Sequence, residues 1–166
     1  MQWRWARAHG SIGITGEGGA LATRNGWGGV GYRPAVCGEV LRAEGEAYAE
    51  FTWVSGRLMV GVARAGVDPS SMSEGLHRTA DGWMYACWHG NYYHNGSSTP
   101  WASGTKQGIA EGETVGLLLQ RGSLHVYLKG RRAGTLVSGL SGQLVWAADL
   151  YRQGASVRIA RKPTPK

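Results

Sequence analysis

The chain has 166 residues, a formal net charge of +7, and 28 glycines against 5 prolines. This length fits one domain with a core of its own and leaves little room for a second. Glycine at this frequency is typical of many short strands joined by tight turns, because glycine adopts positive φ without steric cost. The composition therefore favours an all-β domain over a helical one.

Cysteine content and hydrophobic runs exclude further classes. Cys37 and Cys87 are too few for a disulfide framework and lack the paired spacing of a zinc site, so we expect both thiols to be reduced and buried. No run approaches the roughly 18 apolar residues that span a bilayer, and the N-terminus has no apolar signal region. We therefore expect a cytoplasmic or nuclear protein that does not contact membranes.

Arginine supplies 14 of the 18 basic residues. Its planar guanidinium holds carboxylates and phosphates through two parallel hydrogen bonds, so an excess of arginine over lysine favours recognition of an anionic partner. Compositional bias of the gene explains the same excess, since dispersed charges are usually solvated surface. Nothing besides charge points to nucleic acid, and we do not expect a nucleic-acid partner.

The first half of the chain reads as short strands separated by turns. Residues 11–15 and 20–24 flank Gly-Glu-Gly-Gly and predict a hairpin. Residues 28–37 predict a loop. Residues 48–54 alternate between two faces, so that one face, with Ala49, Phe51 and Trp53, must be buried. Residues 58–63 form a nearly continuous apolar run, which is typical of a central strand covered on both sides.

The second half begins with the longest irregular stretch, residues 64–82, and loops of this length usually serve binding or are mobile. An aromatic strand follows, and Trp83 and Trp146 are expected in the core with Trp53. Residues 114–120 and 123–128 predict a hairpin across Arg121-Gly122. The remaining strands are expected over 143–150 and 155–160.

Three stretches then stand in one order: Glu46-Ala-Tyr-Ala-Glu50-Phe, Leu58-Met-Val-Gly-Val-Ala-Arg64 and Gly122-Ser-Leu-His-Val-Tyr-Leu-Lys-Gly130. Together with Asp81-Gly-Trp83 and Val145-Trp-Ala-Ala-Asp149, this series resembles the SPRY/B30.2 family over about residues 10–159. The resemblance implies a two-sheet antiparallel β-sandwich, a concanavalin-like jelly roll, as a single domain over residues 1–160. Residues 161–166 are expected to form a disordered basic tail.

The family binds peptide segments of partner proteins through loops at one end of the sandwich and is rarely catalytic. The resemblance places the site on an N-terminal arm, on the loop after the strand Leu58–Arg64 and on the loop before the last strand. The expected peptide contacts are Arg33, Pro34, Ala35, Leu76, His77, Tyr151, Arg152 and Gln153. Arg33 and Arg152 can pair with an acidic or amide-rich segment, and Tyr151 can supply an apolar wall. The alternative is that both arginines are solvated loop charges.

Two other binding functions stay open. Trp88 and Trp101 lie around a glycine-rich turn and, if exposed, favour a lectin-like carbohydrate site, although Trp88 also fits a second core layer. Lys129, Arg131 and Arg132 form a compact positive cluster that suits a phosphorylated small molecule or nucleic acid. A phosphorylated or nucleic-acid ligand would then bind away from the peptide loops.

The sequence contains no recognisable set of catalytic or metal-ligating residues. No pair of carboxylates can be nominated from spacing as the acid and base of a glycosidase, and Glu50, inside a strand, is expected to be hydrogen-bonded rather than catalytic. Cys87, His89 and His94 match no standard metal-ligand pattern. We therefore expect a monomeric, non-catalytic protein-interaction module without cofactor or metal.

Overall fold

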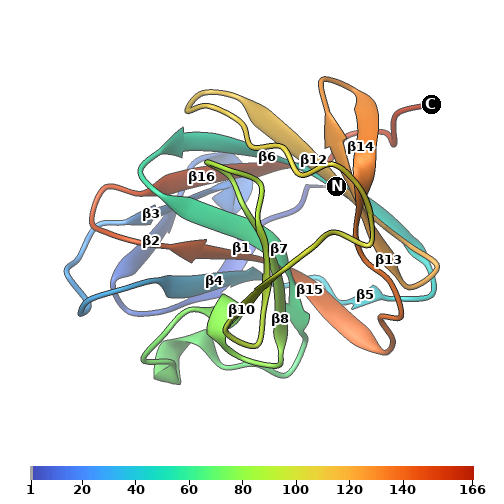
Figure 1. Ribbon diagram of the computed structural model, residues 1–166. Coiled ribbons are helices and arrows are strands. Elements are labelled where there is room, and N and C mark those ends of the chain that lie inside the picture. The colour runs from blue at the N-terminus through green and yellow to red at the C-terminus, as the bar shows by residue number, and fades with distance from the viewer. Residues whose placement is uncertain (1) are drawn as a thin grey trace.

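The computed structural model describes residues 2–166 and forms a sandwich of two antiparallel sheets with eight strands each (Figure 1). The first sheet has the order β1 (Trp5–Ala8), β4 (Arg33–Cys37), β15 (Gln143–Leu150), β7 (Leu58–Arg64), β8 (Gly82–Ala86), β9 (Tyr92–His94) and β10 (Ser97–Thr99), with β5 (Leu41–Arg42) paired to β15. The second has the order β11 (Ser103–Gly104), β14 (Arg131–Val137), β13 (Ser123–Leu128), β12 (Thr114–Gln120), β6 (Glu46–Ser55), β16 (Ser156–Ala160), β3 (Leu21–Arg24) and β2 (Ile12–Thr15). The all-β sandwich expected from the sequence is confirmed.

Helical structure among the described residues is limited to three single 3₁₀ turns, η1 (Glu17–Gly19), η2 (Pro69–Ser71) and η3 (Leu76–Arg78). No helix within residues 2–166 has the length and apolar character needed to cross a membrane. Both predicted hairpins, β2–β3 and β12–β13, are present, and Gln120 pairs with Ser123 across the second turn.

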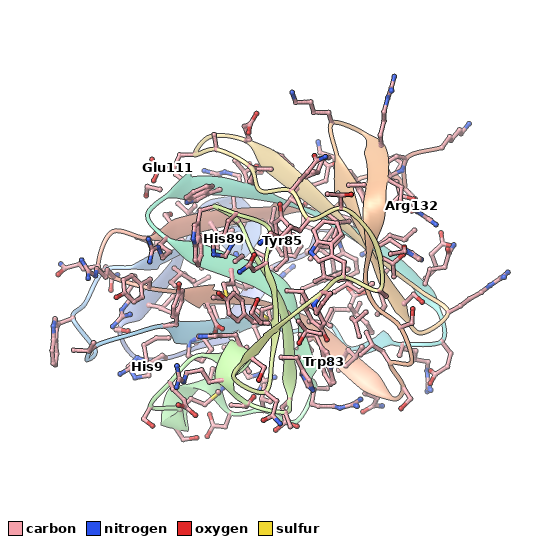
Figure 2. The ribbon with its side chains drawn as sticks, viewed as in Figure 1. His9, Trp83, Tyr85, His89, Glu111 and Arg132 are labelled. Carbon is pink, nitrogen blue, oxygen red and sulfur yellow. The ribbon has the colours of Figure 1, made fainter. Side chains whose placement is uncertain are left out.

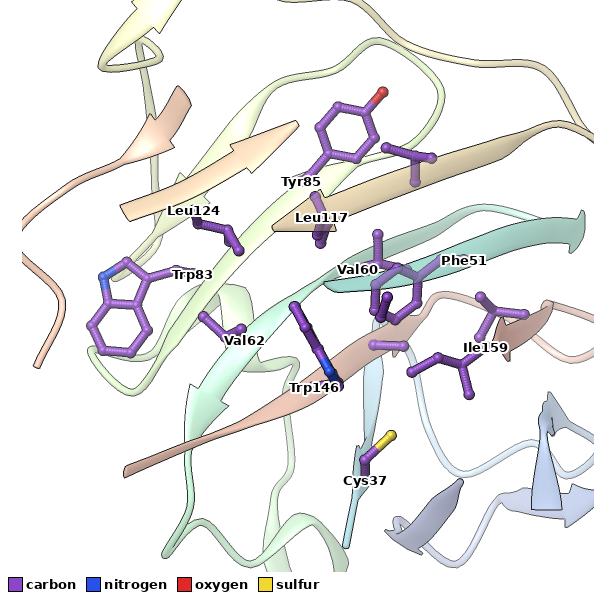
Figure 3. Close-up of a cluster of buried hydrophobic side chains, with 14 of the residues drawn as sticks. Cys37, Phe51, Val60, Val62, Trp83, Tyr85, Leu117, Leu124, Trp146 and Ile159 are labelled. Atoms are coloured by element: carbon purple, nitrogen blue, oxygen red, sulfur yellow. The ribbon is translucent and has the colours of Figure 1, made fainter. Parts of the chain in front are cut away.

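The core lies between the two sheets (Figure 3). Trp146 of β15 is fully buried and its ring packs edge-on against Phe51 of β6, with centroids 5.8 Å apart. The predicted inward face of residues 48–54 is confirmed, since Ala49, Phe51 and Trp53 are all buried. Burial of such large apolar side chains is the main force that holds the two sheets together.

A second apolar layer covers the outer face of the first sheet. The segment between β7 and β8 folds back over this face, and Leu76 of η3 is fully buried in a cluster with Met59 and Met84. The long irregular stretch predicted over residues 64–82 is therefore a packed covering segment. Its packing fixes the position of η3 over β8.

One expectation about the first half of the chain is wrong. The loop predicted over residues 28–37 ends early, because Arg33, Pro34 and Ala35 begin strand β4, which pairs with β1 on one side and β15 on the other. The exposure of Trp101, which the sequence left open, is decided by the structure: the ring is buried, with 9% exposure, and donates Nε1–H to the Gly90 carbonyl over 2.8 Å.

Candidate functional site

The three segments that the sequence assigned to the site meet at one end of the sandwich. They line a pocket of about 370 Å³. Its walls are Val30, Gly31, Tyr32, Arg33, Ser73, Glu74, Gly75, His77, Arg78 and Tyr151. Arg33, His77 and Tyr151 of the predicted set therefore come together, although they are far apart in the sequence.

The other predicted residues divide between a neighbouring pocket and the protein interior. Arg152 and Gln153 are exposed and line a second pocket of about 410 Å³, which shares Tyr151 with the first. Pro34, Ala35 and Leu76 are buried. These three were expected as peptide contacts, but their side chains pack inside the fold because β4 and η3 are covered on both sides.

Arg33 is also not the free surface cation that the sequence suggested. Its side chain is only 7% exposed, Nε donates to the Gly28 carbonyl over 3.0 Å, and Nη1 donates to the Tyr32 carbonyl over 2.8 Å. Burial of a guanidinium requires hydrogen-bond acceptors, and the carbonyls of the adjacent loop supply them to Nε and Nη1. Arg33 therefore shapes the pocket wall from within.

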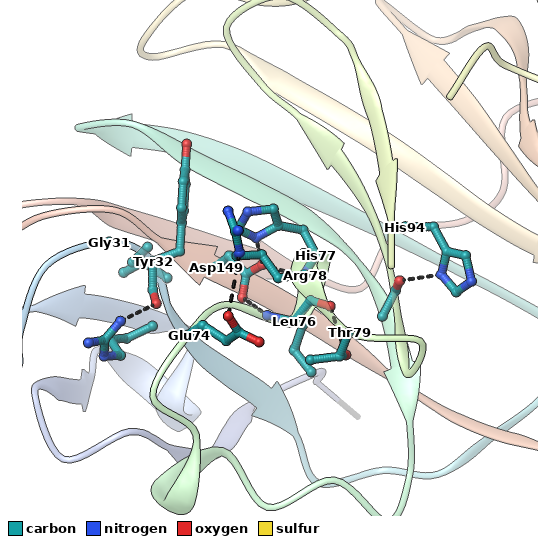
Figure 4. A network of polar contacts seen from close by, with 12 residues as sticks. Gly31, Tyr32, Glu74, Leu76, His77, Arg78, Thr79, His94 and Asp149 are labelled. Carbon is teal, nitrogen blue, oxygen red and sulfur yellow. Dashed lines mark hydrogen bonds and ion pairs between the residues drawn. The ribbon is translucent and has the colours of Figure 1, made fainter. Parts of the chain in front are cut away.

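Asp149, at the end of β15, anchors η3 to the first sheet (Figure 4). Its fully buried carboxylate accepts hydrogen bonds from the backbone N–H groups of Leu76 at 2.8 Å and His77 at 2.9 Å, and from His77 Nδ1 at 2.9 Å. Gly75 must lack a side chain, since a Cβ there would lie 2.7 Å from His77 Nδ1 and 2.8 Å from the Asp149 carboxylate.

The same contacts determine what His77 offers to the pocket. A carboxylate only accepts hydrogen bonds, so Nδ1 of His77 carries the proton that points at Asp149. The side chain is 7% exposed and lines the pocket, and Nε2 has no partner within residues 2–166. Nε2 is therefore the ring nitrogen left to contact whatever occupies the pocket.

Arg24 organises the opposite wall and was missed by the sequence reasoning. It is 1% exposed, and its two terminal nitrogens donate to the carbonyls of Trp27, Gly29, Gly31, Leu150 and Tyr151. These contacts hold the glycine-rich loop before β4 against the end of β15. The alternation of strand β3, which puts Arg24 on the same face as buried Ala22, was the one signal in the sequence.

An aromatic surface continues from the pocket along this end of the molecule. Its members, in the order in which neighbouring rings contact each other, are Tyr151, Tyr32, His77, Tyr93, His89 and Trp88. The guanidinium of Arg57 lies over both end members, Trp88 and Tyr151. The centroids of Tyr32 and Tyr151 lie 4.8 Å apart, and those of Tyr32 and His77 lie 4.7 Å apart. Sequence reasoning named several of these residues but did not bring them together.

The surroundings shift the pKa values of two groups on this surface. Burial raises the pKa of the Tyr32 hydroxyl well above its ordinary value. Burial, Lys106 and Arg57 together lower the pKa of His89. Both shifts favour the neutral forms of Tyr32 and His89.

The predicted basic cluster lies on the β13–β14 hairpin, and Figure 2 shows its Arg132 well separated from His89. Arg132 donates from Nε and Nη2 to the Tyr127 hydroxyl, at 3.2 and 3.0 Å. Lys129 and Arg131 line a separate groove. Glu50, as expected, is hydrogen-bonded, accepting from the Tyr48 hydroxyl at 2.9 Å.

Neither thiol is placed for chemistry. Cys37 and Cys87 are free and buried, as predicted, and burial raises the pKa of both. Within residues 2–166, no group of three or more histidine, cysteine, aspartate or glutamate side chains is arranged to hold a metal ion.

No protein-family model matches the sequence, and no curated protein matches it either. Solved structures do match. The SPRY domain of human HERC1 has a TM-score of 0.76 and 20% sequence identity, with 95% of this chain and 97% of that chain covered. The TRIM65 PSpry domain has a TM-score of 0.71 and 14% identity, with 98% and 93% covered.

Stonustoxin gives a third match, with a TM-score of 0.67 and 15% identity over 95% of this chain but 28% of the toxin chain. The strand composition, the two-sheet order and the near-complete coverage of two SPRY domains agree with one another. The chain therefore has the SPRY β-sandwich fold.

Proposed function

We propose that this chain is a non-catalytic protein-interaction module that binds a short, acidic or amide-rich segment of a partner protein at the end of the sandwich formed by its pocket loops. The observation that carries the proposal is the convergence of three distant segments on pockets that share Tyr151. Segments brought together in this way form a continuous surface that a short chain can cross. Two of the matched solved structures are SPRY domains, which supports the same class of function.

The chemistry of the pocket suits a peptide. Tyr32 and Tyr151 offer partly exposed rings, Arg152 offers an exposed guanidinium, and His77 offers its Nε2. Energetically dominant contacts in interfaces are enriched in tyrosine, tryptophan and arginine, because these side chains combine a large apolar area with a polar group. A segment with acidic or amide side chains would satisfy the polar groups while its backbone crosses the rings.

The test is a peptide-array screen of the purified domain at low and physiological salt. A double variant, Tyr151→Ala with Arg152→Ala, is screened in parallel, with Arg158→Ala on strand β16 as the matched control that also removes one exposed arginine. Hits from the wild type should weaken about 30-fold or more in the double variant, which corresponds to the roughly 2 kcal/mol expected of a dominant contact, and should survive in the control.

Two results would contradict the proposal. The first is a set of hits that the double variant retains in full. The second is binding that is lost at physiological salt and is equally strong in the wild type and the double variant, because that pattern indicates diffuse electrostatic attraction to the basic surface.

A further inference from the structure

Arg57 has an unusual position at the turn between β6 and β7. Its Cζ lies 4.7 Å from the ring centroid of Trp88 and 5.6 Å from that of Tyr151, so two aromatic side chains support one guanidinium. The backbone fixes this arrangement, since the Tyr151 N–H donates to the Arg57 carbonyl over 3.0 Å. The Arg57 side chain nevertheless stays exposed.

What separates Arg57 from the other stacked arginines is its set of unused donors. Of the arginines that lie over aromatic rings, four also bond to a carbonyl, hydroxyl or carboxylate: Arg64, Arg132, Arg152 and Arg161. Within residues 2–166, the Arg57 side chain makes neither a hydrogen bond nor an ion pair. Its N–H groups are therefore held in place and free to bind.

A guanidinium held in this way is a prepared binding group. An arginine side chain loses conformational entropy when it is fixed, and stacking on Trp88 and Tyr151 restricts this side chain before any ligand arrives. Removing the ordering cost in advance is the usual way in which a preorganised surface gains affinity. The planar fork then matches the two oxygens of a carboxylate or phosphate.

The surrounding charges also favour an anion. The Arg152 guanidinium lies over the same Tyr151 ring, 4.8 Å from its centroid, and Lys106 is close enough to lower the pKa of His89. The acids near this end have other partners. Asp149 is buried with its own three donors, and the Glu111 carboxylate accepts from the Gly56 N–H over 2.8 Å without pairing to Arg57.

We propose that Arg57 is a specificity-determining residue that binds an anionic side chain of the partner segment, through a carboxylate or a phosphate group, while Trp88 and Tyr151 hold its guanidinium in place. This inference rests on the proposed function and adds a contact that sequence reasoning did not name. It replaces Arg33, whose buried side chain donates from Nε and Nη1 to loop carbonyls, as the cation that selects an acidic partner.

The experiment uses four synthetic peptide pools with the same randomised flanks and glutamate, glutamine, phosphoserine or serine fixed at the centre. Each pool is titrated by fluorescence polarisation against the wild type, Arg57→Gln, Arg57→Lys and the control Arg158→Gln. Loss of one partly exposed charged hydrogen-bonding group is expected to weaken the anionic pools about tenfold. Thermal unfolding confirms that each variant is folded.

The wild type and Arg158→Gln should favour the glutamate or phosphoserine pool over its neutral counterpart, and Arg57→Gln should lose that preference while still binding the neutral pools. Arg57→Lys should retain only part of it, because lysine has no planar fork. Preference for phosphoserine alone identifies a phosphate, and preference for glutamate identifies a carboxylate. Equal binding of anionic and neutral pools, or a preference kept by Arg57→Gln, overturns this inference alone. Absence of binding by every pool overturns the proposed function with it.

Discussion

Substitution of Arg24 by methionine tests whether the binding end of the sandwich depends on one buried guanidinium. The side chain lies inside the fold, and its donors contact five backbone carbonyls, of which three belong to the loop before β4 and two to the end of β15. Methionine has a similar length and no donors. The substitution therefore removes all five contacts while largely filling the space.

The expected loss follows from which carbonyls remain without partners. The Leu150 carbonyl, 3.1 Å from Nη1, is buried, and a buried acceptor left unpaired costs about 1–3 kcal/mol. The other four carbonyls are partly exposed, so water replaces much of what they lose, and together they add about 1 kcal/mol. We expect a total loss of about 3 kcal/mol in the free energy of unfolding, or about 6–12 °C in Tm for a domain of this size.

Urea denaturation measures this loss, with Arg158→Met on the neighbouring strand β16 as a control whose side chain is exposed. Amide hydrogen exchange should also show residues 25–31 losing protection in the Arg24 variant before the rest of the domain. A buried charge is costly in itself, and apolar replacement of buried charges is often neutral or stabilising. A variant as stable as the control would show that this cost outweighs the hydrogen bonds and would refute the reasoning.

Three further predictions concern single contacts. Asp149→Asn replaces a carboxylate with three donors by an amide that accepts through one oxygen only, so the free energy of unfolding should fall by about 2–4 kcal/mol in urea denaturation, and an unchanged midpoint would count against the anchoring role. Gly61→Ala forces a methyl group against the backbone carbonyl of Trp83, so Tm should drop by an amount equivalent to about 2 kcal/mol or more, whereas a neutral effect would mean that β7 and β8 can separate. Arg57→Gln removes a cation that lowers the pKa of His89, so that pKa should rise in an NMR titration, and a fall would contradict their proximity.

The sequence was sufficient for the fold because the information needed was local. Alternation over residues 48–54 depends only on which faces of one strand are apolar, and β6 buries that predicted face. The same holds for the β12–β13 turn, where Arg121 at φ 50° and Gly122 at φ 78° take the positive values that a two-residue hairpin requires. Local patterns of this kind predict structure without knowledge of long-range contacts.

The site was harder to predict because its contacts are not local. Proline after arginine favours a turn by local chemistry, yet Pro34 lies in a strand because β15, more than a hundred residues later, pairs with it. Asp149 was placed correctly in a closing strand, but its contact with His77 spans 72 positions of the sequence. Arg57 carried no signal at all, since its importance depends on Trp88 and Tyr151 meeting around it.

The buried charged groups of the described residues share one location. They are Arg24, Arg33 and Asp149, and all three hydrogen-bond to backbone groups at the end of the sandwich where the pockets lie. Burying such groups is costly unless each is hydrogen-bonded, and a fold that needed only stability would satisfy this end with apolar side chains. Their placement instead holds the backbone of irregular loops in place, and a surface that is ordered before binding loses less conformational entropy when a partner binds. The proposed peptide pocket and the proposed Arg57 contact both depend on this order.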